Sequence, residues 1–333
     1  MFDSPGAFQQ ALYRTIILLA AASIMIFCWI FLRISRGDLL LVVLSALSAV
    51  RVSALPCSSL QLRGIIGIVS GSAILQYIIS VTSHLQLLNL LLPAAASWFI
   101  LHVMSAGSAY IVLLTGFLSF TAPAGAAAGA ARAVDMLFAG AAAWLAILPA
   151  GKSNPLPRVP DLGAALPKRR VSIESLMIFA GLFLYKILSM KQGIWIILTI
   201  IFICMIRQPG ESNIKLVRQR IFSVPLGIML GGIYSAAVVG LDHRLAYLVP
   251  LIAASGFFML YYRHDFFTFS LFFMFAFTVY ADWVNGTLRE FNFRQLLAGR
   301  SLATVTGALL LLSIEKLSAE FSAAEHGQHE KIS

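Results

Sequence analysis

Charged residues are scarce in this chain of 333 residues. They make up 11% of it, against roughly a quarter of a soluble domain, while hydrophobic residues make up 59%. This balance excludes a soluble globular protein and indicates a polytopic membrane protein. Acidic residues are fewer than basic ones, 14 against 24, so the net charge is +10. In a membrane protein this excess indicates basic cytoplasmic loops that obey the positive-inside rule. We therefore expect a lipid bilayer, and no nucleic acid, as a partner.

Cysteine and catalytic motifs are also nearly missing. The three cysteines, Cys28, Cys57 and Cys204, lie in or beside apolar runs without metal-ligand spacing, so we expect free buried thiols and no metal site. The sequence contains no G-x-x-x-x-G-K-[ST] motif for nucleotide phosphates. No nucleophile stands at a catalytic spacing from a base. These absences predict a protein without a cofactor and without enzymatic activity.

Long apolar runs fill most of the chain. A spanning helix needs about 20 such residues, whereas the strands of a membrane β-barrel alternate apolar and polar residues, which these runs do not. The sequence therefore predicts an all-α polytopic membrane protein with about twelve transmembrane helices. Their approximate positions are 14–33, 38–55, 64–82, 86–104, 106–122, 131–149, 172–190, 193–207, 220–240, 245–262, 265–282 and 296–316. The short fifth and eighth runs leave open whether those helices cross fully.

A basic, proline-rich segment, GKSNPLPRVPDLGAALPKRRV at 151–171, is the longest polar break between helices. It predicts an extended cytoplasmic linker between a first six-helix repeat, 1–150, and a second, 172–318, which a polar tail follows at 319–333. With the linker and both termini in the cytoplasm, most of the 24 lysines and arginines lie on that side. We expect a bacterial inner-membrane protein with this orientation.

The last predicted helix of each half carries a weak internal similarity. AARAVDMLFAG at 130–140 aligns with AGRSLATVTGA at 298–308, so that Arg132 corresponds to Arg300 and Ala139 to Gly307. Halves of six helices have the same orientation in the membrane, which predicts two parallel repeats. In transporters built this way, substrate sites lie near the bilayer midplane at the repeat interface.

A motif in the second half carries a resemblance to a known family. W-I-I-L-T at 195–199 precedes a proline-containing loop and then R-I-F-S-V-P-L-G at 220–227. This order resembles the fusaric acid resistance/aromatic acid exporter superfamily, with Ser223 and Val224 departing from the family's glycine and threonine. The matching positions are Trp195, Leu198, Thr199, Pro209, Arg220 and Gly227.

The resemblance implies a function. It suggests a compact branch of the superfamily, in which the linker stands where larger members carry a cytosolic domain. Such a protein is expected to export small organic acids or amphipathic aromatic compounds across the inner membrane, driven by protons. A periplasmic adaptor of the membrane-fusion type is the implied partner, with the outer loop at 284–294 as a candidate docking surface. The sequence leaves a homo-oligomer open. A passive anion channel and a non-transporting assembly subunit are the alternatives.

Five residues inside the predicted helices are candidates for chemistry. Asp135 is the proton-coupling candidate, because a low-dielectric environment favours a neutral carboxyl group; a simple ion pair with Arg132 is the alternative. Arg132 and Arg300 are candidates for binding an organic anion, since a guanidinium fits a carboxylate with two hydrogen bonds. Lys186 and Thr304 complete the substrate-binding candidates. For the arginines and Lys186, snorkelling to the interface is the alternative. The Phe-rich run 265–283 either lines a route for aromatic substrates or faces lipid.

Overall fold

The computed structural model describes most of the chain, and every regular element in the described part is a helix. The described residues are 5–32, 39–53, 55, 58–85, 87–118, 125–149, 166–188, 192–207, 213–238, 254–258, 265–285 and 293–330. The longer helices are α1 (Pro5–Leu32), α2 (Leu39–Val52), α3 (Ser58–Thr82), α4 (Leu88–Val103), α5 (Ala106–Leu118), α6 (Ala126–Ile147), α7 (Lys168–Leu188), α8 (Ile194–Ile206), α9 (Asn213–Val238), α11 (Phe266–Asn285) and α13 (Phe293–Glu330).

Six of these helices are long and apolar enough to cross a membrane: α1, α3, α6, α7, α9 and α13. The others in the described part are shorter; α5 and α8, for example, have 13 residues each. The prediction of a helical membrane protein is therefore confirmed, while the prediction of twelve spans is not. The tenth predicted helix, 245–262, falls mostly outside the described residues, as does most of the linker. Helix α13 continues through the predicted tail 319–333 as far as Glu330.

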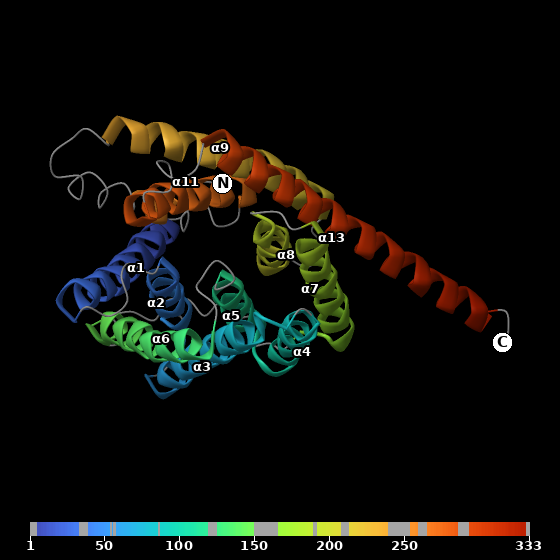
Figure 1. Cartoon of the computed structure of the whole chain (residues 1–333), viewed down its shortest axis with the longest axis horizontal. Helices are drawn as coiled ribbons and strands as arrows, with labels where there is room; N and C mark the ends of the chain where they lie inside the picture. The colour runs from blue at the N-terminus through green and yellow to red at the C-terminus, as the bar shows by residue number, and fades with distance from the viewer. Residues whose placement is uncertain are drawn as a thin grey trace.

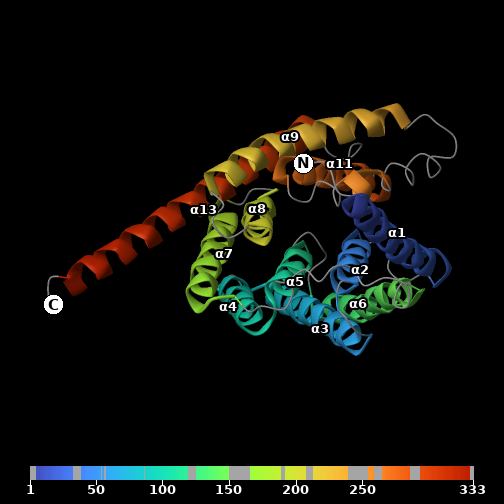
Figure 2. The same ribbon diagram turned by 180° about the vertical axis from the view of Figure 1, so that it is seen from behind.

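The helices form two groups that meet through the short helices (Figure 1). In the first group, α3 packs against α5 and α6, and α1 packs against α2 and α6. In the second, α9 packs against α11 and α13, and α7 packs against α8 and α13. The groups join where α5 contacts α8 and α4 contacts α7, an arrangement also visible from behind (Figure 2). The last part of α13 projects away from both groups.

Helices α5 and α8 lie at the centre of the molecule. Every residue from Ala109 to Leu118 and from Ile194 to Cys204 is buried. A helix that is apolar around its whole circumference has no face suited to water and must be enclosed by other elements. The sequence IWIILTIIFICMI of α8 meets this condition, and α7, α9 and α13 surround it together with α5.

The outer faces of the long helices are also apolar. Large hydrophobic side chains lie exposed on α3, α6 and α9, among them Ile66, Leu137, Phe222 and Ile233, which are 55–65% exposed. A soluble monomer rarely exposes large contiguous apolar patches. Acyl chains of a bilayer are the natural cover for these faces, in agreement with the six helices of spanning length.

Glycines set the closest helix approaches in the second group. A Cβ atom added to Gly227 or Gly231 would lie within about 3 Å of α11 atoms, so this GxxxG pair packs inside the monomer rather than at a dimer face. On α13, a Cβ atom at Gly307 would lie 2.5 Å from the backbone carbonyl oxygen of Ile196. Glycine is therefore the only residue that lets α13 lie against α8 at this point.

We expect Gly307→Ala to destabilise the protein by about 1–3 kcal/mol, the usual cost of overpacking a well-packed site. The clash is with backbone, so no side-chain rotation relieves it. Thermal unfolding of the purified protein in detergent measures the change. Gly67→Ala is the matched control, because its added Cβ atom would meet nothing closer than Met104 at 3.8 Å. Equal midpoints for the two variants would contradict the close α8–α13 contact.

Candidate functional site

Arg220 is completely buried on α9, at 0% exposure. Its guanidinium carbon lies 4.4 Å from the centroid of the Phe202 ring on α8, and Nη1 donates a hydrogen bond of 2.6 Å to Ser270 Oγ on α11. Ser223 Oγ lies 2.6 Å from the same serine oxygen. The Nε and Nη2 atoms of Arg220 have no hydrogen-bond partner among the described residues. A guanidinium is always protonated, so this is a buried positive charge with two donors to spare.

Arg300 repeats this situation on α13. It is 6% exposed, and its guanidinium carbon stacks at 4.8 Å from the Trp195 ring and 5.4 Å from the Phe277 ring. Its Nε makes only a long hydrogen bond of 3.4 Å to Gln192 Oε1, and its buried Nη1 has no partner in the described part of the chain. The interfacial snorkelling that the sequence left open does not describe this side chain, because it is enclosed by aromatic rings.

Aromatic rings connect the two arginines. Phe202 packs against Phe273 with centroids 4.7 Å apart, Phe273 stacks on Phe277 at 6.0 Å, and Phe277 meets Trp195 edge-to-face at 5.4 Å. We call these four rings the aromatic strip. The seven residues from Trp195 to Phe202 correspond to about 10 Å of helix rise, so the strip follows α8 with one arginine near each end. Phe273 and Phe277, from the Phe-rich run, are half-buried and pack against the protein core.

Two threonines beside this strip also carry unpaired groups. Thr199 on α8 and Thr304 on α13 are both fully buried, and their Oγ1 atoms lack a hydrogen-bond partner within the described residues. Thr304 is one helical turn after Arg300, and Thr199 is one turn after Trp195. Both threonines therefore lie one turn from the end of the strip at which Arg300 stacks on Trp195. Buried polar groups without partners are unusual in folded proteins and call for an explanation.

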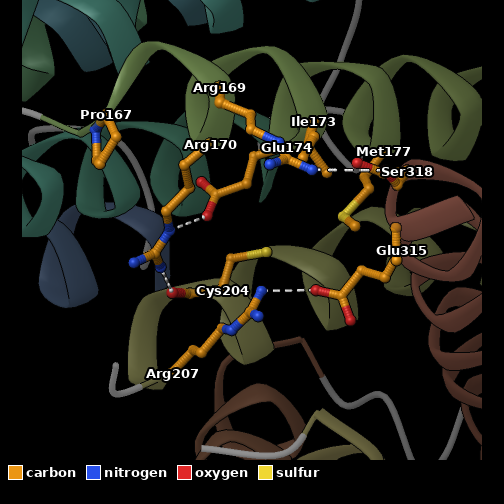
Figure 3. A pocket seen from close by; sticks show the side chains of 11 residues that line it. Pro167, Arg169, Arg170, Ile173, Glu174, Met177, Cys204, Arg207, Glu315 and Ser318 are labelled. Atoms are coloured by element: carbon orange, nitrogen blue, oxygen red, sulfur yellow. Dashed lines mark hydrogen bonds and ion pairs between the residues drawn. The ribbon is translucent and has the colours of Figure 1, made fainter. Parts of the chain in front are cut away.

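A cleft of about 660 Å³ opens where α8 stops between α7 and α13 (Figure 3). Arg170 lines one side of the cleft and makes three hydrogen bonds there. Its Nε donates to Glu174 Oε1 at 2.6 Å. Its Nη2 donates to Tyr110 Oη at 3.2 Å and to the carbonyl oxygen of Cys204 at 3.0 Å. The tyrosine hydroxyl donates to Glu174 Oε2 at 2.6 Å. The last carbonyls of a helix have no partner within it, so the bond to Cys204 caps the end of α8.

A second ion pair crosses the other side of the cleft. Arg207 follows the last residue of α8 and donates from Nη1 to Glu315 Oε1 on α13 at 2.6 Å (Figure 3). The two side chains are 37% and 21% exposed, whereas Glu174 in the first pair is only 4% exposed. Arg170 itself is 29% exposed, so the two ion pairs differ mainly in their carboxylates: Glu174 is enclosed, and Glu315 is partly open.

The structure does not bring the two arginines of the repeat together. Arg132 and Asp135 are half-buried on α6, which packs against α1, α2 and α3, whereas Arg300 lies on α13 against α7, α8 and α9. Lys186 is half-buried on α7 with Nζ 5.7 Å from the centroid of the Tyr185 ring. The structure instead places Arg220, predicted only as a family-motif residue, beside the strip that ends at Arg300.

The remaining motif residues fall in two classes. Trp195, Thr199 and Gly227 are buried contacts of the α8, α9, α11 and α13 group, and Pro209 lies outside the described residues. Among the residues that the structure describes, no group of three or more His, Cys, Asp or Glu side chains could hold a metal ion.

Comparison with known proteins finds no matching protein family, no matching curated protein and no matching solved structure. The resemblance to the exporter superfamily therefore stays a prediction from its motif residues.

Sequence reasoning missed the buried carboxylate. The sequence favours Asp135 as the intramembrane carboxylate, because a seventh helix that begins at 172 leaves Glu174 at its edge. Helix α7 begins at Lys168, and Glu174 is buried at 3% exposure. The spacing Arg170–Glu174, an i,i+4 pair on a helix, was the available signal.

We expect Arg220→Met to leave the thermal midpoint of the protein unchanged or to raise it. Replacing a buried, under-paired charge by a hydrophobic side chain of similar length is often neutral or stabilising by about 1–4 kcal/mol. Ser270→Ala, made in the protein that keeps Arg220, is the control. It removes the one hydrogen bond that Arg220 donates among the described residues, so a third guanidinium nitrogen is left without a partner. That variant should lower stability by about 1–3 kcal/mol. A large loss of stability in Arg220→Met would mean that the arginine serves the fold.

Proposed function

We propose that the chain is a bacterial inner-membrane efflux transporter for small organic acids or amphipathic aromatic compounds, driven by the proton gradient. One observation carries the proposal. Arg220 and Arg300 are buried, are stacked on aromatic rings and keep guanidinium N–H groups without partners among the described residues. A charge buried without a partner is costly in a protein core and defaults to a functional role inside a membrane.

The chemistry of these groups suits an aromatic carboxylate. A guanidinium donates two parallel hydrogen bonds to a carboxylate, and Arg220 and Arg300 have donors left for this purpose. The aromatic strip between them offers ring faces on which an aromatic body can stack. The unpaired hydroxyls of Thr199 and Thr304 add neutral hydrogen-bonding groups along the same helix faces. We propose Arg220 in place of Arg132 as the partner of Arg300.

Two parallel repeats are the architecture that we propose for this transporter. The long helices are the first, third and last of each group, α1, α3 and α6 and then α7, α9 and α13. Corresponding pairs pack alike: α3 with α5 and α6 resembles α9 with α11 and α13. The sequence of buried, half-buried and exposed positions over residues 11–24 is also the same as over residues 171–184. This register makes Arg14 the counterpart of Glu174.

The other parts of the proposal rest on the family resemblance. It implies a periplasmic adaptor of the membrane-fusion type; most of the loop 284–294 that we offer as its docking surface lies outside the described residues. The cytoplasmic position of both termini and of the linker rests on the distribution of basic residues. In that orientation the cleft beside Arg207 faces the cytoplasm, and Arg300 lies toward the periplasm.

The test is binding and transport of benzoate, with uncharged benzamide as the comparison. We expect benzoate to raise the thermal midpoint of the wild type and Arg220→Gln or Arg300→Gln to reduce its affinity about tenfold or more, as loss of a charge-assisted hydrogen bond does. Arg218→Gln is the matched control, because Arg218 is an exposed arginine on the same helix. The two-arginine site is wrong if benzoate shifts the wild type and the Arg220 and Arg300 variants equally.

Asp135→Asn tests proton coupling and separates a carrier from a passive channel. In inverted membrane vesicles with an imposed pH gradient, the wild type should accumulate benzoate and Asp135→Asn should lose accumulation while still equilibrating it. A channel would pass current in bilayers and be indifferent to Asp135. Accumulation that persists in Asp135→Asn would remove that residue from the coupling mechanism. A non-transporting assembly subunit predicts no uptake by the wild type at all.

A further inference from the structure

We infer that the cleft at the end of α8 is a loading site for a carboxylate, in which the ligand replaces Glu315 as the partner of Arg207. The inference rests on the proposed export of organic anions and extends it to a second site. Its basis is the difference between the two ion pairs that cross one cleft of about 660 Å³ (Figure 3). That volume lies within the usual range of small-molecule pockets.

The ion pair between Arg170 and Glu174 is held by several hydrogen bonds and forms a fixed side of the cleft. Both carboxylate oxygens of Glu174 accept hydrogen bonds of 2.6 Å, one from Arg170 and one from Tyr110, and the side chain is 4% exposed. Arg170 is held further by the carbonyl oxygen of Cys204. Although Arg170 is 29% exposed, breaking this pair would leave the buried Glu174 carboxylate without its counter-charge, which is strongly destabilising. An incoming anion therefore does not displace Glu174.

The second ion pair is exchangeable. Arg207 meets Glu315 through a single short contact, Nη1 to Oε1, and both side chains are partly exposed. An ion pair screened by water contributes little to stability, so a carboxylate that approaches from the cleft can take the place of the partly exposed Glu315 at little cost. The guanidinium fork then offers the ligand the two-point contact that Glu315 does not make.

The rest of the lining suits an amphipathic anion. Ile173 and Met177 present apolar surface from α7, and Arg169 adds a positive charge beside the chain of α13 through its contact of 3.5 Å with the Ser318 carbonyl oxygen. With Glu174 neutralised by Arg170, the remaining charges of the cleft favour an anion over a cation. An aromatic carboxylate would place its ring against the apolar side chains and its charge on Arg207.

The position of the cleft connects it to the buried arginines. Arg207 follows Phe202 by five residues, about 7 Å of helix rise, and Phe202 is the ring on which Arg220 stacks. Three arginines therefore succeed one another along α8: Arg207 at the cleft, Arg220 beside Phe202 and Arg300 beside Trp195. A carboxylate released by Arg207 would have Arg220 as its next cation.

The experiment measures the benzoate concentration that half-saturates initial uptake into inverted vesicles, which present the cytoplasmic face. Glu315→Gln removes the competing carboxylate and should lower this concentration about threefold, the size expected for an exposed pair. Arg207→Gln should raise it about tenfold. The maximal rate should change little in either variant, because the buried arginines are intact. The double variant should behave like Arg207→Gln, since without the cation there is nothing for Glu315 to compete for.

Lys316→Gln is the matched control. It removes a charge next to Glu315 on the same helix, but the side chain is 81% exposed and pairs with Glu320 alone among the described residues, at 3.9 Å. Its half-saturating concentration should equal that of the wild type. The loading site is overturned if Glu315→Gln leaves the affinity for benzoate unchanged or weaker, or if Arg207→Gln leaves it unchanged. The proposed function still stands in that case, provided that the wild type takes up benzoate. If the wild type neither binds nor takes up benzoate, the proposed function fails, and the loading site fails with it.

Discussion

Helix α8 is buried around its whole circumference and is too short to cross a bilayer. The arginines of the second helix group and their partners are arranged around it. Its 13 residues correspond to about 20 Å, against about 30 Å of hydrocarbon. Both ends therefore lie within the helix bundle, where backbone groups left over at a helix end need partners. Arg170 caps the carbonyl end, and the cleft exists because α7 and α13 continue where α8 stops.

The arginines around α8 differ in how their charge is balanced. Arg170 and Arg207 pair with Glu174 and Glu315, while Arg220 and Arg300 have aromatic faces and neutral oxygens as their partners in the described residues. Cation–π contacts contribute about 0.5–2 kcal/mol, well below the desolvation cost of a buried charge. The two deep arginines therefore cost more in desolvation than their ring contacts return, which supports the anion site that we propose for them.

Much of the fold was predictable because helices in a membrane need long apolar runs, and the runs are local in sequence. Helices α3, α6, α7 and α9 end within two residues of the predicted ranges, whereas each begins four to seven residues earlier than predicted. The partner of Arg300 was not predictable. Sequence symmetry favoured Arg132, but symmetry relates positions in two repeats without making them neighbours, and α6 and α13 pack in different groups. Glu174 was missed because the helix boundary was placed four residues too late.

The sequence by itself determined that this is a basic, helical membrane protein with a short eighth helix that is apolar except for Thr199, since composition and hydropathy fix those properties residue by residue. Only the tertiary structure decided that Phe202, Phe273, Phe277 and Trp195 form one strip with Arg220 and Arg300 at its ends. These side chains come from α8, α9, α11 and α13, and their meeting depends on close backbone approaches at Gly227 and Gly307. Apolar periodicity tells which residues are buried, but packing geometry alone decides which buried residues touch.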